Sequence, residues 1–210
     1  MKTIVINASP RKKCNTSQIM KSAQKGAESA GAEVEYINLY DYTFKGCVSC
    51  LSCKRKDAER CRCYYRDDLT EIIEKILKAD ALLIGTPIYF GQATSQFRAL
   101  MERLLCCVMS YDGEPTYFTG KVNVGLFYTM NAAKQYYDNV LGPSFEVQAM
   151  MFGMLNGTVK SYGVCNTVQV RDYSKYSMGV FDENIKRENR KNQVGIDLKN
   201  AHDIGAELSR

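Results

Sequence analysis

A chain of 210 residues, 45% of them hydrophobic, is long enough to enclose a sizeable core, and none of its apolar runs approaches the roughly 20 residues of a membrane span. The net charge of +5 is unevenly placed: residues 1–66 carry 13 Lys and Arg against 6 Asp and Glu, whereas residues 67–210 carry 15 against 17. The basic residues are not interleaved with an aromatic platform, and they form no recognisable nucleic-acid-binding motif. We therefore expect no nucleic acid and no membrane as partners, and an anionic cofactor or an acidic redox partner instead.

The hydrophobic pattern predicts alternating strands and helices along the whole chain. In chain order, the expected elements are a strand at 3–7, a helix at 16–31, a strand at 34–39, an irregular cysteine-rich loop at 42–66, a helix at 69–78, a strand at 80–86, a helix at 94–108, a strand at 122–129, a helical stretch at 133–154 interrupted near Gly142-Pro143, a strand within 159–170, an irregular segment at 171–195 and a closing helix at 196–208. Such alternation is typical of a parallel sheet with helices on both faces. We predict one α/β domain over residues 1–210, a three-layer doubly wound fold with five parallel strands in the flavodoxin-like order 2-1-3-4-5.

The stretch from Asn7 to Ser17 joins the first predicted strand to the first predicted helix. Its polar and basic side chains are Ser9, Arg11, Lys12, Lys13, Asn15, Thr16 and Ser17. A helix N-terminus presents free N–H groups and a positive dipole end, so this loop suits a phosphate. An ordinary N-capped helix, with Asn15 or Thr16 as the cap, is the alternative. The loop has neither the glycine pattern of an NTPase P-loop nor that of a dinucleotide-binding turn.

In a doubly wound sheet, ligands bind at the carboxyl ends of the strands where the strand order reverses. The loops expected there are 7–17, 86–95 and 128–133, which are also the most distinctive loops of the sequence. The second loop places Tyr89 and Phe90 directly after a strand. Aromatic side chains in that position are suited to form the walls of a pocket for a flat ring.

Three motifs occur in this order: Ser9-Pro10-Arg11-Lys12 with Asn15-Thr16, a Cys-x-x-Cys-x-x-Cys cluster, and Gly85-Thr86-Pro87-Ile88-Tyr89-Phe90-Gly91. Over roughly residues 1–170 the chain resembles the NAD(P)H-dependent FMN reductases, and within them the iron–sulfur flavoprotein branch. The resemblance implies that FMN is bound by Ser9, Arg11, Asn15, Thr16 and Ser17 at its phosphate, by Pro87, Ile88, Tyr89, Phe90 and Gly91 along its ring and ribityl chain, and by Tyr128, Thr129 and Met130 on the remaining side of the ring. Asn131-Ala132 stand where glycines are frequent in the family, which leaves the contacts of the third loop open.

Five of the nine cysteines fall between Cys47 and Cys63. Since Lys2 leads directly into a strand-like run without the features of a signal peptide, we expect a cytoplasmic protein, where clustered cysteines indicate metal or redox chemistry. The spacing Cys47-x2-Cys50-x2-Cys53-x7-Cys61 matches that of iron–sulfur flavoproteins. The resemblance thus implies a [4Fe-4S] cluster held by these four thiolates, with Cys63 as the other candidate for the fourth ligand. A zinc site, a redox disulfide between Cys50 and Cys53 and a metal-free loop remain open.

The resemblance implies an FMN-dependent oxidoreductase that passes electrons from NAD(P)H to a small acceptor such as a quinone. The alternative is a ferredoxin-linked iron–sulfur flavoprotein that carries electrons without nicotinamide activity. Because the flavin supplies the redox chemistry, we expect no catalytic side chain. The single histidine, His202, falls in the closing helix, away from all three loops. Relatives commonly assemble as homodimers or homotetramers, and we expect the same here.

Overall fold

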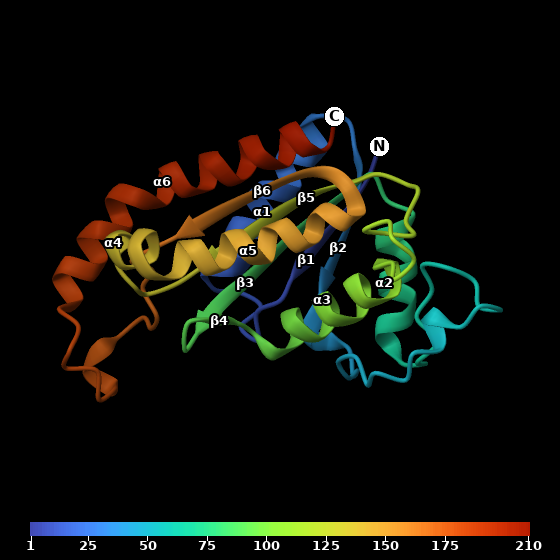
Figure 1. Cartoon of the computed structure of the whole chain (residues 1–210). Helices are drawn as coiled ribbons and strands as arrows, with labels where there is room; N and C mark the ends of the chain where they lie inside the picture. Colours follow the sequence, from blue (N-terminus) through green and yellow to red (C-terminus); the bar gives the residue numbers. More distant parts are fainter.

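A computed structural model describes residues 1–210, and its centre is a sheet of parallel strands (Figure 1). The strands are β1 (Lys2–Asn7), β2 (Glu33–Asn38), β3 (Ala81–Tyr89), β5 (Val122–Thr129) and β6 (Asn156–Val164). They pair in the order β2-β1-β3-β5-β6, and the two-residue strand β4 (Gln92–Ala93) pairs only with the end of β3, antiparallel. With β4 set aside, this is the predicted order 2-1-3-4-5, and the flavodoxin-like α/β prediction is confirmed.

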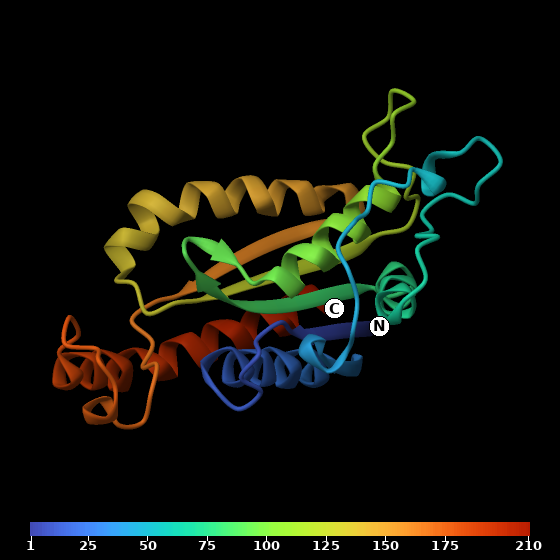
Figure 2. The same ribbon diagram turned by 90° about the horizontal axis from the view of Figure 1, so that it is seen from below.

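The sheet lies between two layers of helices, as the view from below shows (Figure 2). The first layer consists of α1 (Asn15–Ser29) and α6 (Glu183–Leu208). The second layer contains α2 (Asp68–Leu77), α3 (Ser95–Val108) and α5 (Gly142–Phe152). Neighbouring strand residues face opposite layers: Val5 packs with α1 and α6, whereas Ile4 and Ile6 pack with the second layer. Both faces of the central strands are therefore buried, which explains their continuous apolar sequences.

Helices α1 and α6 cross in close contact. A Cβ atom added to Gly205 of α6 would lie only 2.1 Å from the carbonyl oxygen of Ala23 in α1, so only glycine allows the two backbones to approach this far. Asp197 of α6 is buried and accepts hydrogen bonds from Tyr162 of β6, at 2.9 Å, and from Arg190, at 2.8 Å. The closing helix is thus fixed both to α1 and to the edge strand.

Three elements differ from the sequence-based expectation. Strand β6 begins at Asn156, three residues before the range expected for the fifth strand, 159–170. Helix α6 begins at Glu183, so residues 183–195 of the segment expected to be irregular are helical. Asp182 caps this helix by accepting from the N–H of Ile185 at 3.0 Å, and Arg187 pairs with Glu183 at 2.6 Å. Capping and ion pairs stabilise this polar half of the helix, so it can form without the periodic apolar residues by which a helix is recognised in a sequence. Strand β3 also continues to Tyr89, because its end pairs with β4.

The helical stretch that follows β5 is interrupted where the sequence suggests. It consists of α4 (Lys134–Tyr136), a π-helical turn (Tyr137–Leu141) and α5, whose second residue is Pro143. Proline lacks an N–H group and clashes with the carbonyl four residues earlier, so the chain adopts the wider turn just before it.

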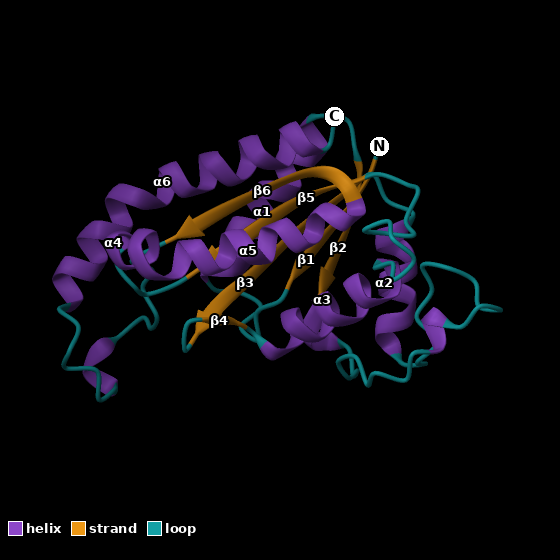
Figure 3. Cartoon of the chain, in the orientation of Figure 1, coloured by secondary structure: helices purple, strands orange, loops and turns teal.

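The cysteine-rich residues 42–66 form a long loop with only a short 3₁₀ turn at Ser52–Lys54 (Figure 3). This loop runs beside α2 and α3, at the end of the molecule where residues 109–121 also project (Figures 1 and 2). None of the helices combines the length and the apolar character that crossing a bilayer requires.

Candidate functional site

The carboxyl ends of β1, β3 and β5 open into a cleft of about 370 Å³. All three predicted loops contribute to it, and all but two of the predicted cofactor-binding residues line it. The predicted residues in the cleft are Ser9, Arg11, Asn15, Thr16, Pro87, Ile88, Tyr89, Phe90, Gly91, Thr129 and Met130. A volume of this size is within the range of small-molecule sites in proteins.

One end of the cleft is formed by the N-terminus of α1. The N-cap residue is Cys14, and no side chain caps the helix, so the N–H groups of the first turn are free of capping partners. Neither Asn15 nor Thr16 is the cap: the Asn15 amide donates to the carbonyl of Val168 at 2.9 Å, and Thr16 shares a 2.7 Å hydrogen bond with the hydroxyl of Thr129. The helix start is therefore open to an anionic ligand, and the two polar side chains fix the neighbouring loops.

Arg11 supplies positive charge at the same end of the cleft. Its guanidinium donates to the carbonyl oxygen of Gln169 at 2.6 Å, and its backbone N–H donates to the hydroxyl of Ser9 at 3.2 Å. Ser9 itself is buried. This arrangement holds an arginine beside the open helix N-terminus, where both favour a phosphate group.

The opposite wall is the tight hairpin between β3 and β4. Phe90 and Gly91 form its turn with φ values of +51° and +76°. Glycine adopts positive φ freely, but a phenylalanine there is strained, and this one is also fully exposed to solvent. Tyr89, next to it, is partly exposed at the cleft. The hairpin therefore presents aromatic surface that the fold itself does not bury.

Two predicted residues lie outside the cleft. Ser17 is buried in the first turn of α1. Tyr128 lies in the core beneath α5, where its ring stacks on Phe145 with centroids 4.2 Å apart and its hydroxyl donates to Gln148 at 2.8 Å. Since residues alternate between the faces of a strand, Thr129 reaches the cleft while Tyr128 packs into the second layer. Burial raises the pKa of the Tyr128 hydroxyl.

The remaining wall combines a predicted loop with residues that the sequence did not identify. Asn131 belongs to the predicted loop 128–133; its amide donates to the Gln169 side chain at 3.1 Å, but its Oδ1 atom is buried and has no hydrogen-bond partner. Thr167, Gln169 and Phe181 line the cleft from the segment between β6 and α6. No local pattern marks these three residues, because they reach the cleft only through the course of a long irregular segment.

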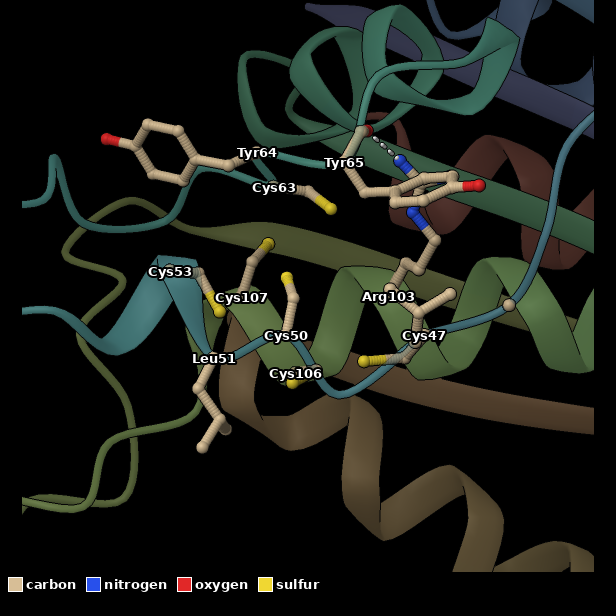
Figure 4. Close-up of a pocket in the computed structure, with 12 residues that line it drawn as sticks. Cys47, Cys50, Leu51, Cys53, Cys63, Tyr64, Tyr65, Arg103, Cys106 and Cys107 are labelled. Carbon is tan, nitrogen blue, oxygen red and sulfur yellow. Dashed lines mark hydrogen bonds between the residues drawn. The ribbon is translucent and has the colours of Figure 1, made fainter.

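A second pocket lies between the cysteine-rich loop and α3 (Figure 4). We call it the thiol pocket, defined by its six cysteines: Cys47, Cys50, Cys53, Cys63, Cys106 and Cys107. All nine cysteines of the chain are free thiols. Burial raises the pKa of Cys106 to about 12, with Cys47 adding to the effect, whereas hydrogen bonds from Ser52 lower the pKa of Cys50.

The predicted fourth ligand, Cys61, does not line the thiol pocket. It borders a separate surface hollow together with Glu59 and Glu74, is only partly exposed, and has a backbone φ of +58°. Cys63, two residues later, lies in the thiol pocket instead. As the side chains stand, no group of three or more His, Cys, Asp or Glu could hold a single metal ion.

Two basic residues fasten the loop to α3. Lys54 donates to the carbonyl oxygens of Cys106 and Met109 at the C-terminal end of α3. Arg103, which is 1% exposed, reaches from α3 to both ends of the loop: it donates to the carbonyl of Lys45 at 3.4 Å and to that of Tyr65 at 2.7 Å. The loop is long, yet these contacts hold it at both ends and in the middle.

A surface groove of about 730 Å³ lies next to both sites. It shares Tyr89 and Phe90 with the cleft, and it shares Gly46 with the thiol pocket. The groove thus extends from the aromatic hairpin, which borders the cleft, to the start of the cysteine-rich loop, which borders the thiol pocket.

A family model described as NADPH-dependent FMN reductase matches residues 1–159. An iron-sulfur flavoprotein of Methanocaldococcus jannaschii is 37% identical over 103 residues, which are 49% of this chain and 51% of that protein. An iron-sulfur flavoprotein of Archaeoglobus fulgidus is 38% identical over 103 residues, or 49% of this chain and 48% of that protein. The matched part thus spans about half the length of these curated relatives.

Among solved structures, an NAD(P)H:quinone oxidoreductase from Methanothermobacter marburgensis resembles this chain with a TM-score of 0.72. The similarity covers 100% of this chain and 98% of that one, at 17% sequence identity. At so low an identity, the likeness shows that the two chains share a fold.

Proposed function

This chain belongs to the NADPH-dependent FMN reductase family, and from that premise we propose that it binds FMN in the cleft and passes electrons from NAD(P)H to a small acceptor such as a quinone. Family membership supports an FMN-dependent oxidoreductase in general. The particular donor and acceptor belong to the proposal.

One observation carries the FMN proposal: an uncapped helix N-terminus and an exposed aromatic hairpin line the same cleft. The phosphate would lie at the α1 end, with the N–H groups of Asn15 and Thr16, the Ser9 hydroxyl and Arg11 as its donors. The helix dipole and the guanidinium both favour a dianion there. Ser17 and the side chain of Tyr128 have no place in this proposal, because both are buried outside the cleft.

The isoalloxazine ring would lie between the segment from Pro87 to Gly91 and the residues Thr129 and Met130. The buried, unpartnered Oδ1 atom of Asn131 fits this arrangement, since a flavin ring carries an N–H group that can donate a hydrogen bond to an amide oxygen. When bound, the flavin supplies the redox chemistry. The chain's own part is to bind and orient the ring and to exclude water from it, which requires no acid or base residue.

The thiol pocket is proposed to hold a [4Fe-4S] cluster through Cys47, Cys50, Cys53 and Cys63. Support comes from the four thiols lining one pocket and from the similarity to proteins named iron-sulfur flavoproteins. A cubane cluster is wider than a single ion, so its thiolates stand farther apart than the ligands of one metal. Cys63 replaces Cys61 as the proposed fourth ligand, because Cys61 lies outside the pocket. The alternatives to a cluster in this pocket are a zinc ion and a loop that binds no metal.

The second candidate function is a ferredoxin-linked electron carrier without nicotinamide activity. The groove beside the aromatic hairpin favours it, since this groove shares lining residues with both the cleft and the thiol pocket. In this case electrons would enter through the thiol pocket rather than from a nicotinamide placed over the cleft.

Anaerobic mixing of the purified, FMN-loaded chain with NADPH, NADH or reduced ferredoxin separates the two candidates. The main proposal requires the flavin absorbance to bleach on addition of a reduced nicotinamide, and to recover when a quinone is added. Bleaching by ferredoxin alone would exclude NAD(P)H as the electron donor and support the ferredoxin-linked electron carrier.

A homodimer or homotetramer is also proposed. Helix α5 exposes Val147, Met150 and Met151, an apolar surface that a second copy could cover. Size-exclusion chromatography with light scattering tests this, and a monomer at all concentrations would contradict it.

A further inference from the structure

Arg103 is a buried arginine with one donor left over. The two N–H groups of Nη1 have acceptors in Asp67, at 2.5 Å, and the carbonyl of Lys45. Those of Nη2 have acceptors in the carbonyl of Tyr65 and the Thr70 hydroxyl, at 3.3 Å. The fifth donor, Nε–H, is buried and has no partner. A buried N–H without an acceptor is costly, so its presence calls for an explanation.

This guanidinium is part of the wall of the thiol pocket. Arg103 lines the pocket together with the six cysteines, and Figure 4 shows its guanidinium end lying beneath the Tyr65 ring, on the same wall as Cys63. The ring of Tyr65 covers the guanidinium at 5.3 Å. Cys63 approaches Arg103 closely enough to interact with it, and Cys50 lies within reach of its charge. The residue that carries the free donor therefore lines a pocket in which half of the lining residues are cysteines.

The same side chain also fixes the spacing between the two arms of the loop. Lys45 precedes the Cys47–Cys53 arm, and Tyr65 follows Cys63. One rigid guanidinium holds both carbonyls, and Asp67 accepts from the Lys45 N–H at 3.1 Å in addition. Lysine has no such planar set of donors and could not hold both arms at once.

We propose that Arg103 is the positioning residue of the thiol pocket: it holds the two cysteine arms at a fixed separation and donates its Nε–H to the sulfur of Cys63, which it thereby orients toward a bound metal. The inference rests on the proposed function only in so far as the thiols bind a thiophilic metal. N–H groups directed at ligand sulfurs stabilise the added negative charge of a reduced centre. Residues that orient metal ligands in this way commonly contribute 10- to 100-fold to metal affinity.

The test uses Cd²⁺ as the probe, added anaerobically to the reduced, FMN-containing chain, with thiolate-to-metal absorbance as the readout. Cd²⁺ needs only two thiolates, so it can bind although no three of them are placed for a single ion. Arg103→Lys is expected to weaken apparent Cd²⁺ affinity about tenfold or more while FMN content changes little. If Arg103 acts through Cys63, the same substitution in a Cys63→Ser background adds no further loss. In a Cys61→Ser background it keeps its full effect. An undiminished effect on top of Cys63→Ser, or no effect at all, would overturn the proposal.

A measurement on the unchanged chain covers the case in which Arg103→Lys does not fold. The buried Nε–H of Arg103 should give a slowly exchanging NMR signal that shifts when Cd²⁺ is added. A signal that does not move at saturating Cd²⁺ contradicts the hydrogen bond to sulfur. An unchanged chain that keeps FMN but takes up neither Cd²⁺ nor iron overturns this inference together with the metal part of the proposed function, and leaves the FMN site standing. Normal uptake by the unchanged chain with no effect of Arg103→Lys overturns this inference alone.

Discussion

The Nη1 atom of Arg103 lies 2.5 Å from the Oδ1 atom of Asp67, and the two side chains are 1% and 15% exposed. Asp67 also begins α2, where its side chain accepts from the N–H of Leu69 at 3.0 Å in a capping box with Thr70. One buried ion pair thus links α3, the start of α2 and both ends of the cysteine-rich loop.

Asp67→Asn should lower the free energy of unfolding by about 3 kcal/mol. Asparagine caps helices as well as aspartate does, so the cap survives, but Arg103 is left buried without its counter-charge. Urea denaturation monitored by circular dichroism measures the loss. Glu71→Gln is the matched control: it removes the same charge from an exposed residue in the first turn of α2, and a change within about 0.5 kcal/mol is expected there. Equal losses in the two variants would show that the buried pair is not special.

Arg11→Ala should weaken FMN binding by about 1–3 kcal/mol through loss of a charge-assisted contact to the phosphate. Lys13→Ala removes the same charge from the same loop, but Lys13 does not line the cleft. Fluorescence titration of the apoprotein with FMN gives both dissociation constants. A comparable loss in the two variants would mean that general charge, rather than a phosphate contact, is responsible.

Phe90→Gly should leave the melting temperature unchanged or raise it slightly. The phenylalanine buries nothing, and glycine adopts the φ of +51° without strain. Turnover and flavin binding should nevertheless fall, whereas Phe90→Tyr, which keeps an aromatic ring, should retain both. Full activity of the glycine variant would show that the exposed ring has no part in the site.

Cys63→Ser should abolish stable iron incorporation after anaerobic reconstitution with ferrous iron and sulfide, since a cubane cluster needs four thiolates. Cys61→Ser, two residues away and outside the thiol pocket, should retain the iron and sulfide of the unchanged chain. Iron and acid-labile sulfide analyses per chain provide the comparison. The reverse result would restore Cys61 as the ligand.

The strand order and most element positions could be predicted because buried parallel strands such as residues 80–86 are continuously apolar, and helices such as α2 carry a clear apolar face. The loops that form the cleft could be predicted from the strand order, because ligands bind where that order reverses. The polar start of α6 could not be predicted, because it is stabilised by the Asp182 cap and by ion pairs and has no periodic apolar residues.

The candidate site could be predicted only in part, because several of its residues are brought together by contacts between distant parts of the chain. Gln169 and Phe181 reach the cleft from a segment without local pattern, and whether Tyr128 faces the cleft or the core depends on strand register. The choice between Cys61 and Cys63 depends on the course of a loop that Arg103 contacts from far away in the sequence. Spacing alone favours Cys61, whereas Cys63 is the one that lines the thiol pocket.

The most direct test of the central claim, that the phosphate of FMN sits at the N-terminus of α1, is a comparison of FMN with riboflavin. The two differ only in the phosphate, so the ratio of their dissociation constants for the apoprotein isolates the contribution of that end of the cleft. We expect FMN to bind at least about tenfold more tightly, equivalent to 1.4 kcal/mol or more, and this preference to shrink in Arg11→Ala. Equal affinity for FMN and riboflavin would contradict the proposed site.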